Sequence, residues 1–126
     1  VAPIGIGRFT EYMQIYYAAP EIADSWDITL APGTVDENGN INRQQMSADR
    51  GVLIMESSEQ KKESWEFIKW WLSDEVQTEF GHTMLVKFGS GFVWNTANKG
   101  AFSKMSLPSD DRAIIIDQWQ SARNYT

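Results

Sequence analysis

The strongest hydrophobic pattern in the chain lies between residues 57 and 72. Large apolar residues recur there at three- and four-residue spacing, which predicts a helix. Trp65, Ile68 and Leu72 form the stripe, with Phe67 and Trp71 beside it. Because apolar residues occupy much of the circumference, we expect this helix to be buried on more than one side. Ser57 and Gln60 have the spacing of a capping box at its start.

Similar spacing predicts three further helices, at residues 9–19, about 73–80 and about 110–122. Pro20 ends the first, because proline cannot continue the backbone hydrogen bonding of a helix. Ser73 can cap the second, and Gly81 is a plausible residue for its C-terminal end. Asp110 or Asp111 opens the last helix, where a negative charge is favourable.

The remaining apolar segments predict short strands, at residues 1–7, 26–31 and 51–55. Residues 34–50 are polar and contain Asn38-Gly39, a strong turn signal, so we expect a loop or an irregular hairpin there. Residues 85–108 read mostly as loop. The sum is an α/β chain whose helices pack on short strands.

Composition and charge narrow the range of functions. The 126 residues carry a net charge of −6, which disfavours nucleic acid and anionic lipid as partners. No cysteine is present, so disulfides, thiol nucleophiles and cysteine-based zinc sites are excluded. We expect no membrane-inserted segment, because no apolar run approaches the required length.

The sequence offers little that could catalyse a reaction. His82 is the only histidine, and it follows a glycine at the expected end of a helix. The acidic run from Asp36 fails as a calcium loop, because the positions of the required glycine and glutamate hold other residues. Residues 5–7 (Gly-Ile-Gly) lack the later residues of a dinucleotide or Walker motif. Asp110 and Asp111 read as helix-start residues. We therefore predict a protein that is not an enzyme and needs no cofactor and no metal.

The central segment resembles a known family. Residues 51–77 read GVLIMESSEQKKESWEFIKWWLSDEVQ, which is similar to the apolar strand, "S-x-x-K-E" turn and "A-W-E-F-L-K-W-x-T-S-x-E-x-Q" helix of extracellular solute-binding proteins, family 1, of ABC transporters. Further matches are Ala18-Ala19-Pro20-Glu21, Ala31-Pro32-Gly33 and Trp94-Asn95-Thr96-Ala97-Asn98. The order and spacing of these segments carry the resemblance, rather than any single motif.

The resemblance implies the C-terminal portion of a two-lobed periplasmic-binding-protein-like fold that closes on its ligand at a hinge. The abrupt apolar start at Val1 is consistent with a piece of a longer protein. Elements of the second lobe would comprise about residues 1–44 and 99–126. Elements of the first lobe would comprise about residues 45–98.

The same resemblance implies a set of ligand-facing residues between the lobes: Gly7, Arg8, Phe9, Tyr12, Ser47, Asp49, Arg50 and Trp94. Small residues are usual in the family where Asp49 and Arg50 stand, so this chain departs from the pattern at that crossing. Tyr12 and Trp94 also suit a role in packing. The other tryptophans, Trp65, Trp70, Trp71 and Trp119, are expected in the core or between lobes.

The function implied is the substrate-binding component of an ABC importer that captures a small polar solute, a sugar or oligosaccharide, and meets permease subunits. Its location would be extracellular, anchored at the surface of a Gram-positive bacterium. Exposed tryptophans would favour a dimer of such a piece. The alternative is a non-catalytic interaction or structural domain that keeps the fold without a ligand site. A glycosidase would need paired carboxylates across a cleft, which the sequence does not indicate.

Overall fold

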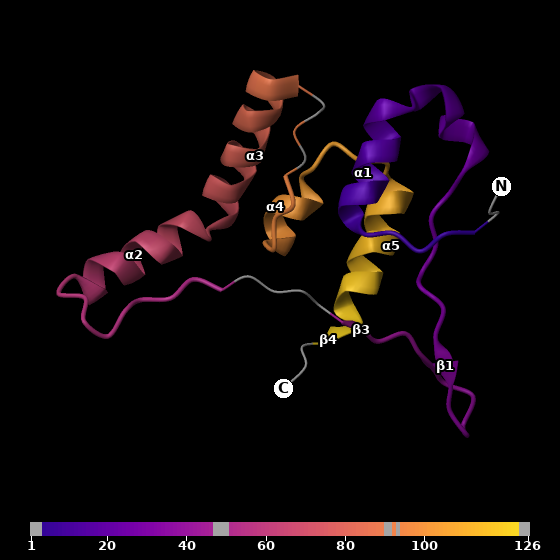
Figure 1. Cartoon of the computed structure of the whole chain (residues 1–126), viewed down its shortest axis with the longest axis horizontal. Coiled ribbons are helices and arrows are strands. Elements are labelled where there is room, and N and C mark those ends of the chain that lie inside the picture. Colours follow the sequence, from indigo (N-terminus) through magenta and orange to yellow (C-terminus); the bar gives the residue numbers. More distant parts are fainter. Residues whose placement is uncertain (1–3, 47–50, 90–91, 93, 124–126) are drawn as a thin grey trace. The chain divides into compact units, whose positions relative to one another are not determined.

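The computed structural model describes residues 4–46, 51–89, 92 and 94–123 (Figure 1). The chain divides into two compact units. Unit 1 comprises residues 1–48 together with 107–126, and unit 2 comprises residues 49–106. Unit 1 is thus built from both ends of the chain, and unit 2 is one continuous segment inserted between them.

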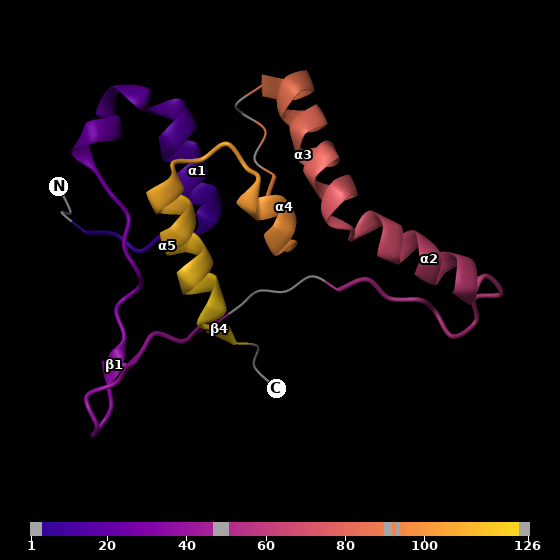
Figure 2. The ribbon, with the colours of Figure 1, turned by 180° about the vertical axis from the view of Figure 1, so that it is seen from behind.

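In its described residues, unit 1 holds two α-helices, a 3₁₀-helix and short strand pairs: α1 (Phe9–Ala18), η1 (Pro20–Ser25), β1 (Thr34–Val35), β2 (Ile41–Asn42), β3 (Gln45–Met46), α5 (Ser109–Gln120) and β4 (Ala122–Arg123). Helices α1 and α5 lie side by side, seen from the front and from behind (Figures 1 and 2). Tyr12 and Met13 of α1 are buried, as is Leu107 just before α5. The core of unit 1 therefore lies around these two helices.

The predicted helices at 9–19 and 110–122 are confirmed as α1 and α5. At the start of α1, the Arg8 backbone N–H donates to Glu11 Oε2 at 2.6 Å. This bond satisfies a backbone donor that precedes the helix. At the other end, Ala19 N–H still donates to Ile15 O at 3.0 Å, and Pro20 then begins η1.

The predicted hairpin is also confirmed. Strands β1 and β2 pair antiparallel, with Val35 opposite Ile41. Asp36 organises the turn: its carboxylate accepts from the backbone of Asn38 and from both the backbone and the side chain of Asn40. These bonds, that of the Asn40 side chain first, lower the pKa of Asp36. Gly39 has φ 84, a conformation that glycine adopts without strain.

A second strand pair joins distant parts of unit 1. Strands β3 and β4 pair in parallel, with Gln45 opposite Ala122 and Met46 opposite Arg123. The sequence did not predict this pair, because two residues are too few to show an alternating pattern. The pair joins residues 45–46, just before the chain leaves unit 1, to residues 122–123, just after α5.

Unit 2 contains three helices in its described residues: α2 (Lys61–Trp71), α3 (Asp74–Phe88) and α4 (Lys99–Ser103). The predicted cap at Ser73 is confirmed, since its Oγ accepts from Val76 N–H at 3.4 Å. The predicted end at Gly81 is wrong, because α3 continues through it and ends at Gly89, whose φ is 74. Gly81 serves instead as the place where the ring of Trp94 approaches: a Cβ added there would lie 2.8 Å from Trp94 Cδ1.

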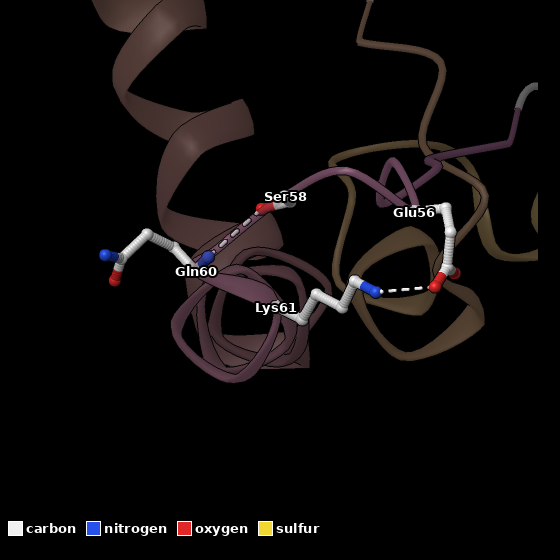
Figure 3. A network of polar contacts seen from close by, with 4 residues as sticks. All are labelled: Glu56, Ser58, Gln60 and Lys61. Atoms are coloured by element: carbon white, nitrogen blue, oxygen red, sulfur yellow. Dashed lines mark hydrogen bonds and ion pairs between the residues drawn. The ribbon is translucent and has the colours of Figure 1, made fainter.

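The start of α2 differs from the predicted capping box. Gln60 is itself the N-cap residue and makes no side-chain cap bond. Its backbone N–H donates to Ser58 Oγ at 3.2 Å, so Ser58 takes the role assigned to Ser57 (Figure 3). Lys61 Nζ, in the first turn of the helix, pairs with Glu56 Oε1 of the preceding segment at 3.0 Å, and both side chains are exposed (Figure 3).

The predicted strands are wrong wherever the structure describes them. Residues 4–7, 26–31 and 51–55 form no strand. Residues 26–30 nonetheless alternate between half-buried and exposed positions. The alternating sequence pattern therefore predicted the burial of these residues correctly, although the segment has no partner strand. The loop expected at 85–108 contains the end of α3 and all of α4. The mixed α/β class is confirmed, although there are many fewer strand residues than expected. The described helices therefore do not pack on an extended sheet.

The expected burial of α2 is wrong as well. Trp65, Phe67 and Trp70 are each more than half exposed. Only the side that carries Ser64, Ile68 and Trp71 is half-buried. Of the four tryptophans assigned to the core or a lobe interface, Trp71 and Trp119 are half-buried, whereas Trp65 and Trp70 are not core residues. None of the described helices combines the length and apolarity that a membrane crossing requires.

Candidate functional site

An aromatic ladder, formed by Phe9, Tyr12 and Tyr16, runs along one side of α1. These residues are three and four positions apart, a spacing that places them on the same helix face. The ring centroids of Phe9 and Tyr12 are 6.2 Å apart with planes 20° from parallel, and those of Tyr12 and Tyr16 are 5.9 Å apart at 18°. Tyr12 is buried and the outer two are half-buried, so any ligand would meet Phe9 or Tyr16 first.

The hydroxyl of Tyr12 connects the ladder to α5. It donates to Asp111 Oδ2 at 2.6 Å across 99 positions of sequence. Burial, and then this hydrogen bond, raise the pKa of Tyr12 well above its ordinary value of 10.0. Because only 7% of Tyr12 is exposed, its role in this structure is packing between α1 and α5.

Two further aromatic residues extend the ladder, and the sequence analysis did not select them for a site. Trp26 meets Tyr12 edge-on, at 5.7 Å and 70°, and its buried Nε1 has no hydrogen-bond partner among the described residues. Tyr17 meets Tyr16 edge-on at 5.1 Å. Burial, followed by the neighbouring Tyr16, raises the pKa of Tyr17. Helical spacing from Tyr12 was the available signal for Tyr16, whereas Trp26 lies after η1, outside the periodicity of α1, and gave none.

Gly7 and Arg8 lie immediately before the ladder. Both are exposed, and Arg8 is the N-cap residue of α1 with extended backbone angles. A Cβ added to Gly7 would meet only Glu11 Cβ, at an ordinary 3.7 Å. The predicted residues Gly7, Arg8, Phe9 and Tyr12 therefore form one continuous group at the start of α1.

The other predicted site residues lie elsewhere. Ser47, Asp49 and Arg50 are outside the described residues. Trp94 belongs to unit 2, where its ring meets Phe80 at 4.7 Å and Trp71 at 6.4 Å, both edge-on. Its Nε1 is buried without a hydrogen-bond partner in the described part of the chain. These contacts give Trp94 a packing role inside unit 2.

A buried polar network holds the same region of unit 2 together. Gln77 and Thr96 are each only 4% exposed. Thr96 Oγ1 donates to Gln77 Oε1 at 2.9 Å, and Gln77 Nε2 donates to Trp71 O at 2.8 Å. Asn98 caps α4 by accepting from Ala101 N–H at 2.8 Å. Buried polar groups that are satisfied in this way specify one arrangement of the elements they join.

The described residues contain few side chains that could catalyse a reaction or bind a metal ion. His82 is exposed on α3. Asp110 and Asp111 occupy the first turn of α5, as predicted for helix-start residues, and Asp111 is engaged by Tyr12. The described residues contain no group of three or more His, Cys, Asp or Glu side chains that could hold a metal ion. What the ladder can provide is flat apolar rings bordered by tyrosine hydroxyls, an arrangement suited to stacking.

Comparison of the chain with models of protein families, with curated proteins and with solved structures gave no match in any of the three.

Proposed function

We propose that this chain is part of a solute-binding protein of an ABC importer, with a two-lobed periplasmic-binding-protein-like fold, and that it captures a sugar or oligosaccharide without transforming it. The observation that carries the proposal is the path of the chain. Unit 1 is discontinuous, and the chain passes between the units near residues 48–49 and again near 106–107. Two connections between two units suit a hinge, because a few residues in each connecting segment can absorb the change in backbone angles when the units move.

The aromatic ladder supports the ligand class. Sugars present flat patches of C–H groups that stack on aromatic rings, and hydroxyls that bind polar side chains. Phe9 and Tyr16 supply rings that are half-exposed, and Arg8 adds a donor beside them. In this proposal Tyr12 holds the platform in place through Asp111, and the rings on either side of it meet the solute.

The proposal extends to location and partners. A binding protein of this class works outside the cell, anchored at the surface, and delivers its solute to permease subunits. The net charge of −6 is compatible with a partner other than nucleic acid or anionic lipid. The importer role would place the solute between lobes that close around it, with closure favoured by contacts made only in the closed state.

Isothermal titration calorimetry tests the ligand class. The 126-residue chain is titrated with neutral mono- and oligosaccharides, and separately with peptides and small anions. We expect saturable binding of at least one saccharide, weakened about tenfold by Tyr16→Ala, since a lost stacking ring costs on the order of 1 kcal/mol. Phe67→Ala is the matched control, because it removes an exposed ring from unit 2. Binding of anions or peptides alone would reject the carbohydrate.

A second candidate function has its own observation. The exposed aromatic and aliphatic residues of α2 favour a non-catalytic interaction domain, because monomeric proteins seldom expose such side chains together. The same titrations distinguish the two: an interaction domain would bind none of the small solutes.

A further inference from the structure

The turn between β1 and β2 carries an asparagine followed by a glycine, a pair that the proposed function does not use. Asn38 and Gly39 stand at the tip of the hairpin, and both are exposed (Figure 1). A Cβ added at Gly39 would meet nothing within 4 Å. The Asn38 side chain makes no hydrogen bond within the described part of the chain. Water therefore reaches both this side-chain amide and the peptide bond that follows it.

This pair has the covalent arrangement in which an asparagine side chain can cyclise. The backbone nitrogen of the following residue can attack Cγ of the asparagine and close a five-membered ring. Asparagine is one of the thermolabile residues of proteins. A following glycine favours the attack, because it has no Cβ to obstruct the approach. Asn38 is the only asparagine of the chain that precedes a glycine.

We propose that Asn38 is a site of spontaneous deamidation and that the folded hairpin turn slows this reaction. The Gly39 nitrogen forms a bond to Asn38 Cγ, the bond between Cγ and Nδ2 breaks, and the proton of the Gly39 nitrogen leaves with the ammonia. One molecule of water then opens the succinimide ring. Water that attacks Cγ gives aspartate, and water that attacks the backbone carbonyl carbon gives isoaspartate. No oxidant or reductant takes part.

The folded turn holds the attacking nitrogen. Gly39 N–H donates to Asp36 O at 3.0 Å, which closes a four-residue turn with Asn38 in third place. A nitrogen whose hydrogen is engaged in this bond has to be released before it can attack Cγ. The reaction therefore starts from a locally opened turn, and its rate follows the population of that opened state.

The carboxylate of Asp36 keeps the turn closed. Its Oδ1 accepts from Asn38 N–H at 2.9 Å and from Asn40 N–H at 2.8 Å, and its Oδ2 accepts from Asn40 Nδ2 at 2.9 Å. The bond from the Asn40 side chain, foremost, lowers the pKa of Asp36, so the group is charged and accepts these bonds at neutral pH. Bonds of this kind from a carboxylate to nearby backbone stabilise turns. Removal of the carboxylate should therefore raise both the population of the opened turn and the rate.

Two other asparagines of the hairpin provide an internal comparison. Asn40 and Asn42 are exposed as well. The residues that follow them are Ile41 and Arg43, whose side chains obstruct attack by the backbone nitrogen, and isoleucine does so more because it branches at Cβ. Within this hairpin we expect deamidation at Asn38 alone.

Peptide mapping by mass spectrometry measures the reaction in the 126-residue chain, sampled over days at neutral pH. Replacement of the amide NH₂ by OH raises the mass of the peptide that contains Asn38, and chromatography separates its aspartate and isoaspartate forms. In guanidinium chloride, where the chain is unfolded, we expect the rate to be at least about fivefold higher, because the hydrogen bonds of the turn no longer form.

Substitutions in the turn test the protective role. Asp36→Ala should raise the rate in the folded chain about three- to tenfold. Glu37→Ala is the matched control, since it removes the same charge from the neighbouring exposed position, and it should react like the wild type. Asn38→Gln should give no product, because its longer side chain would have to close a six-membered ring. In guanidinium chloride the wild type, Asp36→Ala and Glu37→Ala should react at equal rates.

The two parts of the proposal can fail separately. Deamidation at other asparagines with none at Asn38, in the folded and in the unfolded chain, overturns the site. Equal rates in the folded and unfolded wild-type chain overturn the protective role of the turn. A folded Asp36→Ala chain that reacts no faster than Glu37→Ala overturns the assignment of that protection to the Asp36 carboxylate.

Discussion

The hydrogen bond between Tyr12 and Asp111 is the point at which α1 and α5 can be uncoupled by removing one atom. Tyr12→Phe keeps the ring, and therefore its stacking on Phe9 and Tyr16. It removes only the hydroxyl that donates to Asp111 Oδ2 at 2.6 Å. The variant leaves a half-buried carboxylate without this donor. Unfolding of unit 1 should therefore become easier, with no change in its apolar core.

The size of the effect follows from the charge and exposure of the two groups. A hydrogen bond to a charged partner contributes about 1.5–3 kcal/mol to stability. Asp111 is only half-buried, so water can replace part of what is lost. We therefore expect Tyr12→Phe to lower the free energy of unfolding by about 1–2 kcal/mol. With a urea dependence of about 2 kcal/mol per molar, a usual value for a small protein, the midpoint should fall by roughly 0.5–1 M.

Equilibrium unfolding in urea, followed by tryptophan fluorescence, measures this difference. Tyr16→Phe is the matched control, because it removes the same atom from a ring of the ladder whose hydroxyl makes no hydrogen bond among the described residues. A loss of stability in Tyr16→Phe as large as that in Tyr12→Phe would refute the reasoning, as would no loss in Tyr12→Phe.

The same bond predicts how stability depends on alkaline pH. The pKa of Tyr12 in the folded chain lies above its ordinary value of 10.0, chiefly because the side chain is buried. Above about pH 10 the unfolded chain therefore releases a proton that the folded chain retains, and stability falls as pH rises. Below that pH the contribution is fully present. We expect this alkaline loss to be smaller in Tyr12→Phe, with Tyr17 contributing part of what remains.

Three other substitutions test single features of the fold by the same urea unfolding. Gly33→Ala should cost about 1–3 kcal/mol, because its Cβ would lie 2.5 Å from the carbonyl oxygen of Asn42 and force the hairpin apart. Gln77→Leu should cost about 2–3 kcal/mol, because it leaves buried Thr96 without its acceptor. Gly89→Ala should cost about 1–3 kcal/mol and fray the end of α3, since φ 74 with ψ −170 suits only glycine. An unchanged unfolding midpoint in any of these would contradict the corresponding account.

Features that depend on neighbouring residues were predictable from the sequence. Pro20 ended a helix, Ser73 capped one, and Asn38-Gly39 made a turn, because each acts through its own backbone or through residues a few positions away. The candidate residues at the start of α1 came from the family resemblance, whereas helical spacing accounts only for Phe9 and Tyr12 sharing one face. Asp111, the hydrogen-bond partner of Tyr12, is 99 positions distant in the sequence, so no local pattern could predict this contact.

The failed predictions concern contacts between segments that are distant in the sequence. The apolar run at 51–55 suggested a buried strand, yet a strand needs a neighbour, and the described residues provide none. The aromatic circumference of α2 predicted burial for the same reason, and the helix remains exposed on two flanks. Gly81 was read as a helix end because glycine often has that role, but here it makes room for the ring of Trp94. The hydrophobic pattern indicates which residues tend to be buried, but it does not identify the residues that would pack against them.

The central claim, that two units close on a saccharide, is tested most directly by a distance measurement between them. The sequence contains no cysteine, so Asp24→Cys in η1 and His82→Cys in α3, both at exposed positions, can carry a pair of fluorophores without other labelling. We predict that a saccharide that binds in calorimetry changes the energy transfer between the units in a saturable way, at the same concentrations. Saccharide binding without any change in energy transfer, or no saccharide binding at all, would contradict the account.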